Sequence, residues 1–270
     1  MQKTFEIGGP IELELSLTAG DIEVAAGTDG KAEVELVAHD AESQELVDNA
    51  TVEMRGNTLV VDVPEKRGFK FSFRSRGITC TVRCPEGSSL RSRTKSGDVD
   101  VSINLARADV ATASGDVTLR DVSGDASVKT ASGDTTVGDV GGRASVNSAS
   151  GDVSIGRVAG DVNANTASGD ITVDAAGGGF KANSASGDIS IEASGSGDIS
   201  INSASGDIGV GLRRGTRAHL DCNTVSGDTR SELDLSGDEP NGNGPLVHIK
   251  ARTVSGDIHI YSANAQEVQA

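Results

Sequence analysis

Regularly spaced carboxylates are the residues of this chain that first suggest chemistry. The tripeptide Ser-Gly-Asp recurs along the chain, and a column of stacked carboxylates could bind calcium. The aspartates of this main series are Asp98, Asp116, Asp134, Asp152, Asp170, Asp188, Asp207, Asp228 and Asp257. The calcium-binding nonapeptide has a second glycine that this repeat lacks. We therefore expect a structural turn ladder, in which each aspartate bonds backbone N–H groups, with calcium binding as the minor alternative.

The cysteines and histidines do not form a recognisable site. Cys80 and Cys84 share the parity of one predicted strand, so we expect two buried thiols, while Cys222 stands alone. The four histidines are scattered, and none stands at ligand spacing from a cysteine. The nucleophile elbow of hydrolases and the spacing of a dinucleotide-binding loop are both missing. We expect no catalysis, no cofactor and no metal requirement.

A basic segment interrupts an otherwise acidic chain of formal net charge -16. Residues 66–95 carry nine bases and a single acid, Glu86, and they include Phe69, Phe71 and Phe73 at alternating positions. The candidate anion-facing patch is Lys66, Arg67, Lys70, Arg74, Arg76, Arg83, Arg91 and Arg93. One interpretation is a cap strand that buries phenylalanines. The other is a surface that docks an anionic partner, such as a lipid headgroup, a cell-wall polymer or an acidic protein face. The net charge disfavours nucleic acid.

The elements that position these residues follow an 18-residue repeat. The first five intervals of the main series are 18 residues, and the next are 19, 21 and 29, which we interpret as loop insertions, the largest around residues 239–244. Each repeat has two halves with alternating apolar residues, typical of short strands. We expect these apolar residues to be buried: Val117, Leu119, Ile155, Val173, Ile189 and Ile191. A column of asparagines (Asn147, Asn165, Asn183, Asn202 and Asn223) predicts an internal hydrogen-bond ladder.

This pattern predicts an all-β, single-chain β-solenoid (β-helix) with 18-residue coils. Stacked coils pair each strand with its equivalents above and below, and they need only a thin core of Val, Ile and Ala, which suits a chain with no Trp and one Tyr. Residues 96–270 form the regular solenoid. Residues 1–95 form β-rich first coils and an irregular cap of the same continuous domain, with a degenerate repeat at residues 18–24 and a short helix at 41–50. The cap and the tail from residue 262 predict closed ends.

The core motif resembles that of a bacterial family known as putative adhesins, β-strand-repeat proteins of unknown function. The resemblance rests on Thr112-Ala-Ser-Gly-Asp-Val-Thr-Leu119 and Ser184-Ala-Ser-Gly-Asp-Ile-Ser-Ile191, and on the entry into the repeats from Cys84 to Val101. It covers about 180 residues clearly. It implies a single-chain β-helix and a role in the cell envelope or in stress.

These observations favour a non-catalytic, adhesin-like binding or scaffold module. Its partner would be a protein or an anionic envelope component. The alternative is a self-assembling structural β-helix protein that polymerises end to end. The chain has no signal peptide and no apolar run of transmembrane length, so we expect a cytoplasmic protein, peripheral to the membrane if it binds one.

Overall fold

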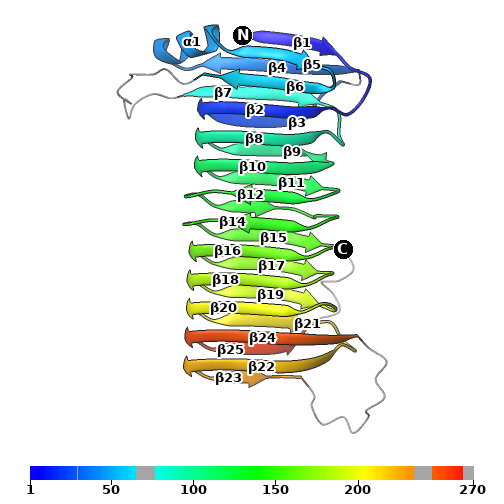
Figure 1. The fold of residues 1–270 in the computed structure, drawn as a ribbon, viewed down its shortest axis with the longest axis vertical. Coiled ribbons are helices and arrows are strands. Elements are labelled where there is room, and N and C mark those ends of the chain that lie inside the picture. Colours follow the sequence, from blue (N-terminus) through cyan, green and yellow to red (C-terminus); the bar gives the residue numbers. More distant parts are fainter. Residues whose placement is uncertain (29, 65–76, 234–244, 264–270) are drawn as a thin grey trace. The chain divides into compact units, whose positions relative to one another are not determined.

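The computed structural model describes residues 1–28, 30–64, 77–233 and 245–263. They form two compact units, Met1–Val137 (unit 1) and Gly138–Ala270 (unit 2), each of which contains two sheets, A and B (Figure 1). The described residues hold many strands and one short helix, so the predicted all-β class is confirmed. The predicted division at residue 95 stays a prediction.

Unit 1 begins with strands that are paired less regularly than the rest. Its elements are β1 (Gln2–Glu6), β2 (Glu12–Ala19), β3 (Asp21–Ala26), β4 (Lys31–Ala38), α1 (Ala41–Asp48), β5 (Thr51–Arg55), β6 (Thr58–Val63), β7 (Ile78–Cys84), β8 (Ser89–Ser96), β9 (Val99–Leu105), β10 (Arg107–Ser114), β11 (Val117–Val122), β12 (Ala126–Lys129) and β13 (Thr135–Val137). Within this unit, sheet A has the order β1-β4-β7-β3-β9-β11-β13, and sheet B has the order β5-β6-β2-β8-β10-β12.

Unit 2 consists of short strands paired in parallel. Its elements are β14 (Ala144–Asn147), β15 (Val153–Val158), β16 (Val162–Ser168), β17 (Ile171–Ala176), β18 (Phe180–Ser186), β19 (Ile189–Ser194), β20 (Ile199–Ser205), β21 (Ile208–Leu212), β22 (Arg217–Ser226), β23 (Thr229–Ser231), β24 (Leu246–Ser255) and β25 (Ile258–Ser262). Within this unit, sheet A has the order β15-β17-β19-β21-β25-β23, and sheet B has the order β14-β16-β18-β20-β24-β22.

Equivalent residues of successive repeats pair directly. Ile171 pairs with Val153 and with Ile189, and Ser168 pairs with Ser150 and Ser186. Long parallel sheets of this kind are consistent with a solenoid. The inward residues of both sheets make the core, and all six predicted core residues are buried, none more than 1% exposed. Cys80 and Cys84 are buried as well, and burial raises the pKa of the Cys80 thiol to about 12.

The glycine of each main turn allows the chain to stack. Gly169 has a φ of +133°, which glycine adopts without the steric cost of a side chain. A Cβ on Gly169 would lie 2.2 Å from the carbonyl oxygen of Gly151 in the preceding repeat. The same close approach recurs at Gly187 and Gly115. Glycine is therefore needed both for the turn and for the spacing between repeats.

The irregular start of the chain agrees with prediction. The helix α1 begins after Asp40, whose side chain accepts a hydrogen bond from the Ser43 N–H (2.7 Å), an N-cap that fits the predicted helix. The degenerate repeat at residues 18–24 is part of the stack, because Ile22 of β3 pairs in parallel with Val99 of β9. Antiparallel pairs, β1 with β4, β4 with β7 and β5 with β6, occur only in this part of the described chain.

The order of the strands departs from the order of the repeats in both units. In unit 1, β2 lies between β6 and β8, although β6 follows β2 in the chain. In unit 2, β24 lies between β20 and β22 (Figure 1). Ser205 therefore pairs with Ser255 and not with Ser226. The intervals of 21 and 29 residues are thus not simple loop insertions between successive coils, because the longer one lets the chain return and insert a coil. Residues 239–244 lie outside the described residues.

Candidate binding surface on sheet B of unit 1

The outward face of sheet B in unit 1 carries charged side chains in cross-strand rows. One row runs from Glu53 through Val60, Glu14 and Arg91 to Asp109, since these residues are direct register partners. The neighbouring row runs from Thr51 through Asp62, Ser16 and Arg93 to Ala111. Alternation places these side chains outward because the residues between them, such as Leu15 and Ser92, are buried.

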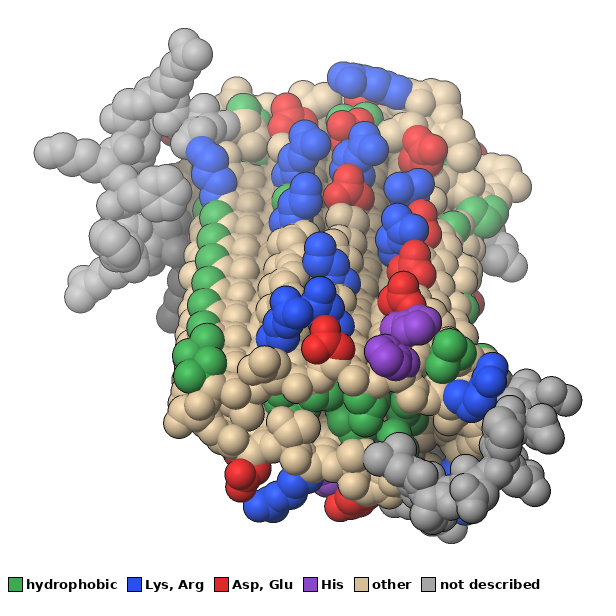
Figure 2. Space-filling view, turned by 60° about the horizontal axis from the view of Figure 1, so that its bottom comes forward, with side chains coloured by type: hydrophobic (Ala, Val, Ile, Leu, Met, Phe, Trp, Pro, Cys, Tyr) green, Lys and Arg blue, Asp and Glu red, His purple; other side chains and the backbone are tan. Residues whose placement is uncertain are grey.

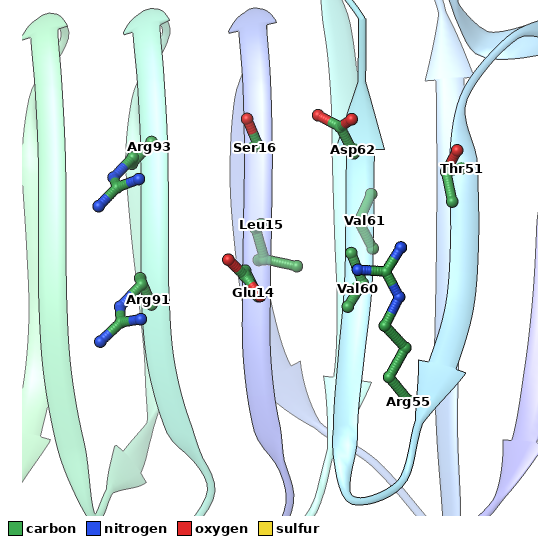
Figure 3. Close-up of a pocket in the computed structure, with 10 residues that line it drawn as sticks. All are labelled: Glu14, Leu15, Ser16, Thr51, Arg55, Val60, Val61, Asp62, Arg91 and Arg93. Atoms are coloured by element: carbon green, nitrogen blue, oxygen red, sulfur yellow. The ribbon is translucent and has the colours of Figure 1, made fainter.

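Two of these rows border a shallow groove of about 270 Å³ (Figure 3). Its lining residues are Glu14, Leu15, Ser16, Thr51, Arg55, Val60, Val61, Asp62, Arg91 and Arg93. Figure 3 shows Arg91 and Arg93 side by side on β8, with the carboxylates of Glu14 and Asp62 on the strands next to it and Arg55 beyond them. Val60 is only 7% exposed although it lies on the outward face, so it forms part of the floor.

The arginines of the groove differ in their partners. Arg91 has Asp109 beside it, with 3.6 Å between Nε and Oδ2, and Arg55 pairs with Glu53 at 2.6 Å. Arg93 has Ser16 and Ala111 as its register neighbours, and no described carboxylate lies within ion-pair distance of it. Both listed pairs are exposed, so water screens them and each contributes little to stability. Arg93 therefore keeps its donors available to a ligand.

The predicted basic patch is divided by the fold. Lys66, Arg67, Lys70, Arg74 and Arg76, together with the three phenylalanines of that segment, lie outside the described residues. Arg83 lies on β7 of sheet A, where its register partner is Glu33, whereas Arg91 and Arg93 lie on β8 of sheet B. These three arginines thus do not share one surface, because the chain passes from one sheet to the other between them. The sequence did not point to Arg55, which comes from a strand far away in the chain.

The aspartate column is a hydrogen-bonded ladder. In unit 2, Oδ1 of Asp152 accepts from the backbone N–H of Asp170 (2.8 Å), and Oδ1 of Asp170 accepts from that of Asp188 (2.8 Å). The ladder continues through Asp207 and Asp257 to Asp228 in spatial order. In unit 1, Asp21 of the degenerate repeat joins it by accepting from Asp98 (3.0 Å). Each carboxylate thereby links two coils.

The asparagine column also forms a ladder, but it lies on the outward face of sheet B in unit 2. Nδ2 of Asn165 donates to Oδ1 of Asn147 (2.9 Å), and Asn183 and Asn202 repeat the contact at 2.7 and 3.0 Å. The predicted fifth member, Asn223, is separated from Asn202 by Arg252. The inserted strand β24 causes this interruption.

Secondary columns hold ion pairs. Asp139 accepts from the guanidinium of Arg157, and Asp161 accepts from the N–H of Gly179 (2.9 Å) and from Arg143 (3.0 Å). These hydrogen bonds hold the pKa of both carboxyl groups below the ordinary value. Among the described residues, no group of three His, Cys, Asp or Glu side chains could hold a metal ion. No helix in the described part is long and apolar enough to cross a membrane.

Comparisons with known proteins agree with this architecture. A family model described as Toastrack DUF4097 matches residues 11–261. A crystal structure of a "putative adhesin" from Bacteroides fragilis is 17% identical, covers 96% of each chain and has a TM-score of 0.46. A "putative lipid binding protein" from Parabacteroides distasonis is 16% identical, covers 97% of each chain and has a TM-score of 0.39. No curated protein matches the chain.

Proposed function

Because this chain belongs to the Toastrack DUF4097 family, we propose that it is a non-catalytic binding module built on a β-solenoid of 18-residue coils. Its binding surface is the outward face of sheet B in unit 1, and its partner is an anionic component of the cell envelope. The family resemblance predicts this kind of role but supplies no catalytic activity. The solenoid supports the proposal because it holds rows of side chains at fixed spacing on a rigid sheet.

The observation that carries the proposal is the pair Arg91 and Arg93. They are two residues apart on one strand, so their guanidinium groups point the same way at the rim of the groove (Figure 3). Guanidinium groups bind phosphate and carboxylate by paired hydrogen bonds. Arg93 has no described carboxylate in reach, so an external anion would not compete with an internal partner. Glu14 and Asp62 on the neighbouring strand would orient the anion toward β8 by repulsion.

Vesicle co-sedimentation tests this function. The wild-type chain should sediment with vesicles that contain phosphatidylglycerol at low salt, and less as salt rises, because exposed charges are screened. A parallel arm uses a soluble anionic polymer, teichoic acid, to distinguish a lipid from a wall polymer. We expect Arg91→Glu/Arg93→Glu to lose most of the binding in the arm that is positive.

A matched control separates a specific patch from net charge. Arg213→Glu/Arg214→Glu makes the same change in charge at two exposed arginines of unit 2. It should bind within about twofold of wild type if the groove is the site, since long-range effects of net charge are screened at moderate salt. Equal losses in both variants, or no binding by the wild type in either arm, would remove the proposal.

A further inference from the structure

The last strands of unit 2 have a neighbour on one side only. β22 pairs with β24 and β23 pairs with β25, and no other described strand pairs with either. The inward side chains of β22 are half-exposed: Ala218, Leu220, Cys222 and Thr224. Their register partners on β24 are buried: Val247, Ile249, Ala251 and Thr253. Figure 2 turns this end of unit 2 toward the viewer and shows hydrophobic side chains inside the coil.

The outer strands of unit 1 are protected in a way that these strands are not. Lys3 of the edge strand β1 stands opposite the buried Val34, and its Nζ donates to the carbonyl oxygen of Val52 on β5 (2.8 Å). An inward-pointing lysine on an edge strand prevents further strand addition. The described residues of β22 and β23 provide no such charge on the core side, because their inward residues are Ala, Leu, Cys, Thr and Ser.

The backbone of β22 presents unpaired groups at this edge. The N–H of Arg217 donates to the carbonyl oxygen of Pro245, so the backbone groups of Arg217 point toward β24. Because these directions alternate along a strand, the N–H and C=O groups of Ala218, Leu220 and Cys222 point toward the open side. An antiparallel strand could bond all three.

We propose that two copies of this chain associate through β22, antiparallel to each other, about a two-fold axis at Leu220. In this register Leu220 faces Leu220 of the second copy, and Ala218 faces Cys222. On the outward face, His219 lies opposite Asp221 of the second copy. A shift of the axis to Asp221 would instead bring two carboxylates face to face, which is unfavourable. The charges of β22 thus match a second copy in the register that also pairs its apolar residues.

The area of this end suits a dimer. Ten residues of β22 span about 33 Å, and two sheets with their outward side chains are about 20 Å thick, so each partner would bury about 650 Å². The total of about 1,300 Å² reaches the lower range of stable interfaces. A two-fold contact uses the same surface on both copies and closes after two. This assembly is separate from the proposed anion binding, and it replaces open-ended polymerisation.

Mass measurement tests the assembly. Sedimentation equilibrium of the full chain should give twice the monomer mass of 27.4 kDa at micromolar concentration. Leu220→Lys places at this edge the kind of charge that Lys3 provides in unit 1, and we expect association to weaken at least about 100-fold because the charge would be buried in the interface. Val254→Lys, at an exposed position of β24 that is no part of the edge, should leave the dimer unchanged.

A cross-link tests the register independently of any loss of folding. Ala218→Cys would face the native Cys222 of the second copy, so treatment with diamide, which accepts the two electrons, should join two chains on a non-reducing gel. The wild type should stay uncross-linked, because its two Cys222 residues would lie about 14 Å apart, and Ala218→Cys/Cys222→Ser is the second control. A monomeric wild type, with residues 234–244 or nothing over β22, overturns the proposal. So do species larger than a dimer, a dimer that Leu220→Lys leaves intact, or equal cross-linking of the wild type.

Discussion

Arg157 holds both oxygens of the Asp139 carboxylate, 18 residues earlier in the chain. Its Nη2 and Nε lie 2.6 and 3.0 Å from Oδ2, and its own backbone N–H donates to Oδ1 at 2.9 Å. One residue thus supplies both the ion pair and the inter-coil backbone bond. The main aspartate column makes the backbone bond alone, as Asp170 does with the N–H of Asp188.

This pair predicts a pH-dependent contribution to stability. Arg157 lowers the folded-state pKa of Asp139 below the unfolded value, so the contribution is present above about pH 4 and is lost as pH falls through the lowered value. Arg157→Ala should therefore reduce the free energy of unfolding by about 0.5–1 kcal/mol at pH 7. The difference from wild type should shrink toward pH 2. Urea unfolding at several pH values measures it, with Arg214→Ala as the control; a difference that grows as pH falls would contradict the argument.

Gly169→Ala should destabilise the chain strongly. The new methyl group would meet the Gly151 carbonyl at 2.2 Å, and a φ of +133° is strained for alanine, so we expect a loss of about 3 kcal/mol or more. Gly8→Ala is the matched control, because nothing lies within 4 Å of the added atom. Thermal unfolding compares the two. Equal melting temperatures would mean that neighbouring repeats are not as close as described.

Val173→Asp should cost several kcal/mol. Val173 is fully buried, and an unpaired carboxylate in a narrow apolar core has no solvation to replace water. Val254→Asp makes the same substitution at a side chain that is 54% exposed, and it should change the free energy of unfolding by less than about 0.5 kcal/mol. Denaturant titration of both variants checks the inward and outward parity of the strands.

Asp170 separates hydrogen bonding from charge in the aspartate ladder. Asp170→Asn keeps an oxygen that can accept from the N–H of Asp188 and removes one of three neighbouring like charges, so it should be neutral or stabilising. Asp170→Ala leaves that N–H without its acceptor and should cost about 1–2 kcal/mol. If the asparagine variant were as unstable as the alanine variant, the negative charge itself would be required.

Calcium addition tests the remaining alternative for this ladder. We expect the melting temperature to stay within about 1 °C when millimolar calcium or a chelator is added, because a ligand stabilises only a fold that binds it. Each described aspartate of the column already uses one oxygen for a backbone bond between coils. A rise of several degrees with calcium that a chelator reverses would favour a metal-binding function instead.

Much of the repeat could be predicted from local pattern. Alternating Val and Ile identify the strands and their buried face, and glycine at a constant position identifies the turn, because both depend on the period of the side chains alone. Val173, Ile189 and Cys80 are buried for this reason. The basic segment was predicted as one surface, however, because proximity in sequence was used in place of strand position. Arg83 and Arg91 lie on different sheets.

The sequence by itself determined the strands, the glycine turns and which side chains form the core. These follow from backbone geometry and the burial of alternate residues, which act within one repeat. Only the tertiary structure decided which repeat lies beside which. A repeat offers almost the same backbone edge and apolar face to every other repeat, so its own residues do not select its neighbour. The long connections allow β24 to insert between β20 and β22, and that choice breaks the asparagine ladder at Arg252 and leaves β22 at the edge.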